Sequence, residues 1–156
     1  MAAMSDFLEN KLIDFLFRAQ ALGITGATAA AGTGPATLYY ALLTAAPSDT
    51  GGGTEVTGGS YARVAVTSSL ANMAGTQAAA STTASSGTTG TTSNNAAITF
   101  PAPSANWGVV THFGVYDAST SGNLLFYGAL TASKTINNGD AAPAFAISAF
   151  TLQIDN

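Results

Sequence analysis

The sequence predicts a mainly β protein, an antiparallel β-sandwich or jelly-roll-like domain that follows an N-terminal amphipathic α-helical arm. Short apolar or alternating segments are separated by frequent Gly, Pro, Asn and Asp residues, which is typical of antiparallel strands. One segment near the N-terminus has helical periodicity, and no further amphipathic helices alternate with the strands, which argues against a parallel α/β sheet. With 156 residues and no cysteine, the chain is long enough to bury a core without disulfides.

The first predicted element is a helix from Asp6 to about Leu22, ended by Gly23. Asp6 and Glu9 have the three-residue spacing of a capping box. Asp14 and Arg18 are four residues apart and can pair across one turn.

The apolar residues of this helix cover roughly 200° of its circumference, whereas a surface helix needs an apolar stripe of only about 100°. They are Leu8, Leu12, Ile13, Phe15, Leu16, Phe17 and Ala19, and Asn10, Lys11, Asp14 and Arg18 lie on the remaining side. We therefore expect the helix to contact partners on more than one side. These partners are either its own domain or neighbouring subunits.

The residues between this helix and the first strand, 25–36, have the Ala, Thr and Gly composition of a linker. We therefore predict a helical arm over residues 1–24, this linker, and a β-sandwich domain over residues 37–156. Strands are expected at 37–44, 61–67, 97–100, 109–116, 124–130, 134–136 and 144–154. Asn137–Asp140 is predicted to form a tight hairpin turn, and the small polar residues 75–95 to form a long loop outside the core.

Charge is unusually scarce. Charged residues make up 8% of the chain, and none lies between Val64 and Tyr116, whereas an ordinary soluble domain has about 25%. Such a surface suits a subunit packed beside many copies of itself, although a secreted Ser/Thr-rich protein has a similar composition.

The net charge of −4 and the scattered cations argue against nucleic-acid binding. No apolar run reaches the ~18–20 residues of a membrane span, and the N-terminal residues do not have the pattern of a signal peptide.

No phosphate-binding loop, nucleophile elbow or metalloprotease motif occurs in the sequence. His112, the only histidine, lies in a predicted strand near Asp117, and nothing marks a nucleophile beside it. A sheet-face histidine with one hydrogen bond is therefore favoured over a catalytic triad. The carboxylates lie mostly in predicted turns, where they bind local backbone N–H groups, and no calcium-loop spacing is present. We expect no enzymatic activity, no metal and no cofactor.

Two further features have alternative interpretations. An aromatic group on neighbouring strands could form the core or a sugar-stacking platform, with the core favoured; its members are Trp107, Phe113, Tyr116, Phe126 and Tyr127. Arg63 is the only cation between Arg18 and Lys134. We predict a structural ion pair of Arg63 with Glu55, either within the domain or between subunits.

Four segments of the sequence resemble a family of small bacteriophage virion proteins that are usually labelled tail fibre or structural proteins. They are MSDFLENKLIDFLFR (4–18), LYYALLTAAPSDTGGGTEVTGGSYARVAV (38–66), SNNAAITFPAPSANWGVVTHFGVYDA (93–118) and GNLLFYGALTASKTINNGDAAPAFAISAFTLQID (122–155). Their order matches, and together they cover most of the chain. The TGGGTE loop, the TFPAP–W–G turn and the NNGD turn are fairly specific in combination.

The resemblance implies a non-enzymatic virion structural protein present in many copies. Because the sequence has neither a membrane-span nor a signal-peptide pattern, we expect this protein to be assembled in the cytoplasm of the bacterial host. With the arm, it suggests a tail or baseplate fibre or fibre-adaptor subunit on the particle exterior. The assembly interface is then expected on the arm, at Leu8, Leu12, Ile13, Phe15, Leu16 and Phe17. Two alternatives remain, a head decoration protein that cements the capsid and a host-carbohydrate-binding module. The expected partners are other copies of the chain, other virion proteins and a host surface glycan.

Overall fold

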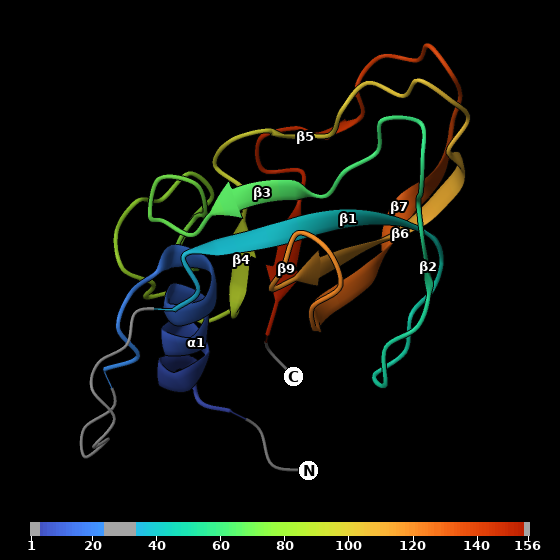
Figure 1. Ribbon diagram of the computed structural model, residues 1–156. Coiled ribbons are helices and arrows are strands. Elements are labelled where there is room, and N and C mark those ends of the chain that lie inside the picture. Colours follow the sequence, from blue (N-terminus) through green and yellow to red (C-terminus); the bar gives the residue numbers. More distant parts are fainter. Residues whose placement is uncertain (1–3, 24–33, 155–156) are drawn as a thin grey trace. The chain divides into compact units, whose positions relative to one another are not determined.

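The computed structural model describes residues 4–23 and 34–154, which form one helix and nine strands (Figure 1). The elements are α1 (Asp6–Arg18), β1 (Thr37–Ala45), β2 (Thr54–Glu55), β3 (Val64–Thr67), β4 (Thr91–Ser93), β5 (Ile98–Thr99), β6 (Gly108–Tyr116), β7 (Leu124–Ile136), β8 (Ala144–Phe145) and β9 (Thr151–Gln153). The mainly β class with an N-terminal helix is thus confirmed, and the pairings β1–β2, β1–β6, β6–β7 and β4–β9 are antiparallel. Packing of two sheets as a sandwich or jelly roll stays a prediction.

The described chain forms two compact units, each built from segments far apart in sequence. Unit 1 contains α1 together with Thr67–Ala97 and the segment from Phe145 onward, and unit 2 contains Leu38–Val66 and Ile98–Ala144. These units do not follow the expected division into an arm, a linker and one β-domain. Residues 25–33 of the expected linker lie outside the described residues.

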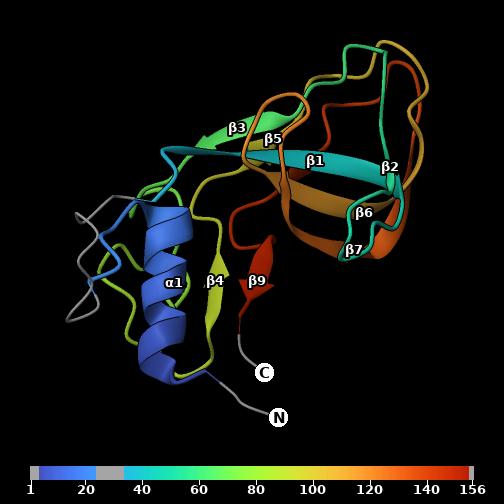
Figure 2. The ribbon, with the colours of Figure 1, turned by 60° about the horizontal axis from the view of Figure 1, so that its bottom comes forward.

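Unit 2 is organised around a sheet with the strand order β2-β1-β6-β7, in which β3 also pairs with β1. Figures 1 and 2 both show β6 between β1 and β7. The expected strands 37–44 and 109–116 are confirmed as β1 and β6, and β1 is buried over Leu38 and Tyr40–Leu43. Because successive side chains of a strand point to opposite faces, the burial of Tyr40–Leu43 in succession shows that both faces of β1 are covered there.

Unit 1 contains α1 and the strand pair β4–β9. Figures 1 and 2 both show β4 beside α1, with β9 beyond β4. Thr92 and Asn94 are each only 1% exposed. The expectation that residues 75–95 lie outside the core was therefore wrong at the two ends, 75–76 and 92–94, whereas residues 77–89 are exposed or half-buried as expected. Their polar groups are satisfied: Thr92 donates to the backbone oxygen of Ala74 at 2.7 Å, and the Asn94 carbonyl accepts the Phe150 N–H at 2.9 Å. Small polar side chains can form a core when every group is hydrogen-bonded.

The helix is shorter than expected, because it ends at Arg18 and not near Leu22. Ala19 has a left-handed conformation (φ 53°), and its N–H donates to the backbone oxygen of Asp14, which turns the chain away from the helix axis. The expected capping box was also wrong. Asp6 is already helical, and the backbone oxygen of the N-cap Ser5 accepts the N–H groups of Leu8 and Glu9.

Two expected strand boundaries differ in the structure. Residues 124–130 and 134–136 belong to one strand, β7, whereas the segment 144–154 is divided into β8 and β9. Asn137–Asp140 does form a turn, in which the Asp140 N–H donates to the backbone oxygen of Asn137 at 3.2 Å. The turn does not close a hairpin, because β7 pairs with β6 and β8 pairs with β5. Turn residues fix a local bend, but tertiary contacts choose the partner of the next strand.

The loop that faces α1 leaves no space for a side chain at Gly87. A Cβ added there would lie 2.2 Å from the backbone oxygen of Thr76, so Gly87→Ala is expected to lower the free energy of unfolding by about 1–3 kcal/mol. Denaturant unfolding followed by circular dichroism measures the change. Ser86→Ala, at the exposed neighbouring residue, is the control and should stay within about 0.5 kcal/mol of the parent chain. Equal stability of the two variants would contradict the prediction.

Candidate functional site

The buried side of α1 combines charged and apolar residues. Its buried residues are Glu9, Ile13, Asp14, Phe17 and Arg18. Leu8, Leu12, Phe15 and Leu16 are only half-buried, and Phe7 is 57% exposed. Two residues of the expected assembly interface, Ile13 and Phe17, are fully buried in the monomer, so a partner cannot reach them in this arrangement. The four half-buried residues are defined here as the outer face of α1.

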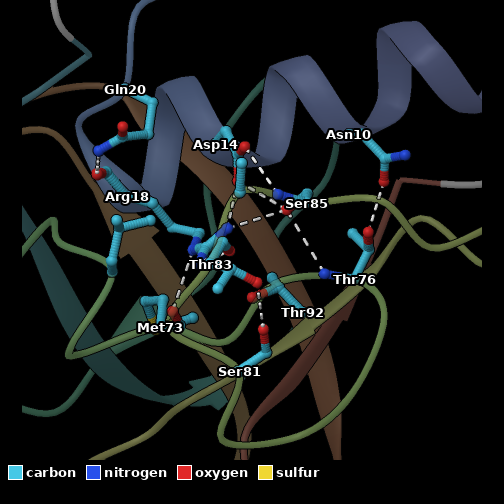
Figure 3. A network of polar contacts seen from close by, with 12 residues as sticks. Asn10, Asp14, Arg18, Gln20, Met73, Thr76, Ser81, Thr83, Ser85 and Thr92 are labelled. Atoms are coloured by element: carbon cyan, nitrogen blue, oxygen red, sulfur yellow. Dashed lines mark hydrogen bonds and ion pairs between the residues drawn. The ribbon is translucent and has the colours of Figure 1, made fainter.

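Arg18 holds the buried side of α1 in place. Its side chain is fully buried, and its Nε donates to the backbone oxygen of Met73 at 3.1 Å (Figure 3). The terminal nitrogens donate to the Asp14 carboxylate, to Ser85 Oγ at 3.1 Å and to the backbone oxygen of Thr83. The ion pair of Asp14 and Arg18 expected from their spacing is confirmed. One guanidinium thereby binds two stretches of the 73–85 segment to the helix.

Asp14 and Asn10 bind the same segment from the preceding turns of α1. Ser85 donates to Asp14 twice, from its N–H at 2.9 Å and from its hydroxyl at 2.6 Å. Asn10 donates to the backbone oxygen of Gly87 at 2.9 Å and accepts a hydrogen bond from the Thr76 hydroxyl (Figure 3). A buried ion pair is costly to desolvate unless further hydrogen bonds satisfy its remaining atoms. In unit 1 the segment from Met73 to Gly87 supplies those bonds.

Arg63 plays a similar part in unit 2. Its guanidinium forms an ion pair with Glu55 (Nη2 to Oε2, 2.8 Å), and its Nε lies 3.0 Å from Glu55 Oε1. Nη1 donates to the backbone oxygens of Ala118 and Ser121, each at 2.8 Å. The guanidinium carbon lies 3.6 Å from the centroid of the Tyr116 ring. The hydrogen bond to Glu55 raises the pKa of Arg63 above its ordinary value, and the arginine joins β2 to the turn that connects β6 and β7.

Tyr61 connects Glu55 to the centre of the sheet. Its hydroxyl donates to Glu55 Oε1 and accepts the Leu42 N–H, both at 2.9 Å. Burial raises the pKa of Tyr61 well above its ordinary value, so the hydroxyl stays protonated and can donate. The ring packs edge-on against Trp107, with 5.3 Å between centroids.

Two members of the expected aromatic group, Trp107 and Tyr116, are buried. Trp107 is 5% exposed, and its ring N–H donates to the backbone oxygen of Gly59 at 2.9 Å. Tyr116 is 9% exposed, whereas Tyr127 is 40% exposed. A sugar-stacking platform that includes Trp107 is therefore wrong. Phe113 and Phe126 are half-buried, and Tyr127 is the most exposed member of the group.

His112 makes one side-chain contact of the kind expected, with 2.8 Å between its Nδ1 and Thr111 Oγ1. Within residues 4–23 and 34–154, no three His, Asp or Glu side chains are grouped so that they could hold a metal ion. The described part of the chain also has no helix of the length and apolar character needed to span a membrane.

A polar cleft opens in unit 2 beside Tyr127, and we refer to it as the Tyr127 cleft. Its volume is about 460 Å³. It is lined by Ser48, Asp49, Thr50 and Gly51 from the loop after β1, and by Gly122, Asn123, Leu124, Leu125 and Tyr127 around the start of β7. The sequence pattern assigned Asp49 to a turn. Nothing in that pattern indicated that residues 48–51 lie beside β7, since this depends on the path of the loop after β1.

The comparisons with known proteins give one family. Residues 3–153 match the family model described as Podophage GP4 fiber I protein gp80. No curated protein matches the chain.

Removal of the buried cation from α1 is expected to be strongly destabilising. Arg18→Met leaves the Asp14 carboxylate buried and unpaired, which should lower the free energy of unfolding by about 3–5 kcal/mol. The double variant Asp14→Leu with Arg18→Met should recover part of that loss, because neither charge of the Asp14–Arg18 pair is then left buried without its partner. Denaturant unfolding of the four forms of this double-mutant cycle measures both effects.

Lys11→Met is the matched control for the loss of a cation from α1. Lys11 is half-buried, and its ammonium lies 5.8 Å from the centroid of the Phe7 ring. This variant should change stability by less than about 0.5 kcal/mol. A loss for Arg18→Met no larger than the loss for Lys11→Met would show that the buried network does not hold the helix.

Proposed function

Because this chain belongs to the family of the podophage GP4 fiber I protein gp80, we propose that it is a tail fibre or fibre-adaptor subunit on the exterior of the virion. The resemblance of the sequence to phage fibre-type structural proteins is confirmed by the same match. The family supports a structural and non-enzymatic role in a virion component. The position of the subunit in the tail or baseplate region belongs to the proposal.

The outer face of α1 is the observation that carries the proposed mode of attachment. The Asp14–Arg18 network fixes the helix from its inner side, so Leu8, Leu12, Phe15 and Leu16 are presented at a defined position. Apolar side chains gain stability when a partner removes them from water, at about 25 cal/mol per Å². We propose that a neighbouring virion protein or another copy of the chain covers this face.

The scarcity of charge supports assembly into many copies. Only 12 of the 156 residues are Lys, Arg, Asp or Glu (4 and 8), and two of the four cations, Arg18 and Arg63, take part in ion pairs within the chain. Little like-charge repulsion therefore opposes close packing of copies. Closed symmetric arrangements are the usual result when identical subunits associate.

Immunogold labelling of intact phage tests the location. With antibodies against the folded chain, gold is expected at the tail or baseplate. Gold spread over the head would contradict the fibre assignment and make the chain a decoration protein. Absence of gold from both intact and disrupted particles would contradict any virion role.

Two carboxylates on the outer face of α1 should block attachment. Leu12→Asp with Leu16→Asp places charges where a partner must desolvate them, which is costly without a counter-ion. Both residues are only half-buried, so the monomer should remain folded. We expect a loss of at least about tenfold in incorporation into particles, measured by quantitative immunoblotting of purified phage.

The matched control adds the same charge elsewhere. Ala102→Asp with Ser119→Asp changes two exposed residues of unit 2 and should leave incorporation unchanged. Circular dichroism of each soluble variant checks that the β-structure persists. Normal incorporation of the Leu12 and Leu16 variant would show that the outer face of α1 is not the attachment surface.

A further inference from the structure

The Tyr127 cleft has the size and chemistry of a small-molecule site. Its volume of about 460 Å³ lies within the range of about 300–1,000 Å³ that is usual for ligand pockets. No lysine, arginine or histidine is among its lining residues, and Asp49 is its charged group. An anionic ligand would therefore meet a carboxylate and no cation.

Tyr127 supplies a fixed aromatic surface. Its ring is 40% exposed, and its hydroxyl donates to Asp49 Oδ1 at 2.7 Å. This hydrogen bond raises the pKa of Tyr127 above its ordinary value, so the hydroxyl remains a donor. Because the hydroxyl is held at one end, the ring has little freedom to turn away, and its apolar face remains available in a wet cleft. Leu125, 36% exposed, adds apolar surface to the same wall.

Hydrogen-bond acceptors surround that ring. Asp49 uses one oxygen for Tyr127, and its other oxygen accepts no hydrogen bond from the described residues. Asn123 donates to Asp117 from its backbone and from its side-chain amide, each at 2.7 Å, which orients the amide and leaves its carbonyl oxygen as an acceptor. These hydrogen bonds hold the pKa of Asp117 below its ordinary value. The Asp117 carboxylate therefore continues to accept both hydrogen bonds from Asn123 at neutral pH.

The hydroxyl groups of Ser48 and Thr50 complete the polar lining. They lie 3.0 Å apart, and Ser48 also donates to the backbone oxygen of Gly51. The cleft thus combines one aromatic face with several acceptors and hydroxyl groups. A ligand that fits this set has an apolar ring face and many hydroxyl donors at its edge, and it has no negative charge.

We propose that the Tyr127 cleft binds one pyranose unit of a neutral saccharide. The apolar face of the sugar lies on the Tyr127 ring, and neighbouring hydroxyls donate to Asp49 and Asn123. Hydrogen bonds to a charged carboxylate are stronger than those to neutral acceptors. The inference rests on the proposed function only for the source of the sugar, a glycan of the host surface, because the binding itself can be measured on the isolated chain.

The probes are the methyl glycosides of glucose, galactose, mannose, rhamnose and N-acetylglucosamine, with methyl glucuronide and glucose 6-phosphate as anionic comparisons. Titration of the full chain is followed by two-dimensional NMR of backbone amides. At least one neutral glycoside should shift the amides of residues 48–51 and 122–127, and the anionic sugars should bind at least about tenfold more weakly.

Variants of the cleft test the assigned contacts. Tyr127→Ala should weaken binding by roughly tenfold or more, since it removes the stacking surface. Asp49→Asn should also weaken binding, although it keeps the side-chain shape. Tyr127→Phe retains the ring, so its loss should be smaller than that of Tyr127→Ala. Phe7→Ala removes an exposed aromatic ring from α1, far from the cleft in sequence and in unit 1, and should bind like the parent chain.

Three results would overturn the proposal. They are no binding of any neutral glycoside of the panel, preferential binding of the anionic sugars, and unchanged affinity in both Tyr127→Ala and Asp49→Asn. If Tyr127→Ala fails to fold, Asp49→Asn and Tyr127→Phe still decide the site. Gold on the tail without saccharide binding would refute this inference alone, whereas saccharide binding by a chain absent from virions would refute the proposed function alone.

Discussion

Each unit of this protein depends on one arginine that satisfies the backbone of its loops. In unit 1, Arg18 donates to backbone oxygens of Met73 and Thr83 and pairs with Asp14. In unit 2, Arg63 donates to backbone oxygens of Ala118 and Ser121 and pairs with Glu55. A guanidinium has five N–H donors in a rigid fork, so one side chain can join several segments that have no regular structure of their own. A chain with four cations uses two of them in this way.

The position of α1 follows from this constraint. A helix whose apolar face covers about 200° would ordinarily turn that face inward. Here the polar segment from Met73 to Gly87 offers backbone oxygens and hydroxyl groups, which an arginine and a carboxylate satisfy better than leucine does. The Asp14–Arg18 pair therefore faces inward with Ile13 and Phe17, and the outer face of α1 is left half-exposed. The surface proposed for attachment is thus a consequence of how the helix is held.

The scarcity of charged residues also determines the chemistry of the Tyr127 cleft. With so few charged residues, a single carboxylate decides which ligands the cleft can accept, because no cation is present to neutralise an anion. Asp49 also orients Tyr127, so one residue sets both the charge of the cleft and the direction of its aromatic ring. Asp117 has the corresponding role toward Asn123. Hydrogen bonds within the loops therefore preorganise the lining before any ligand arrives, which lowers the entropic cost of binding.

The sequence by itself determined the mainly β class, the N-terminal helix, the strands β1 and β6, the pairing of Asp14 with Arg18 and the family resemblance. These features depend on periodicity, on spacing along one element and on motifs, all of which are local. Only the tertiary structure decided that Thr92 and Asn94 are buried, that the Asp14–Arg18 pair of α1 faces inward and that Asp49 lies beside Tyr127. Each of these depends on which distant backbone groups need a partner, because polar residues are buried wherever those groups satisfy them. The periodicity of a sequence does not predict which distant backbone groups will need a hydrogen-bond partner.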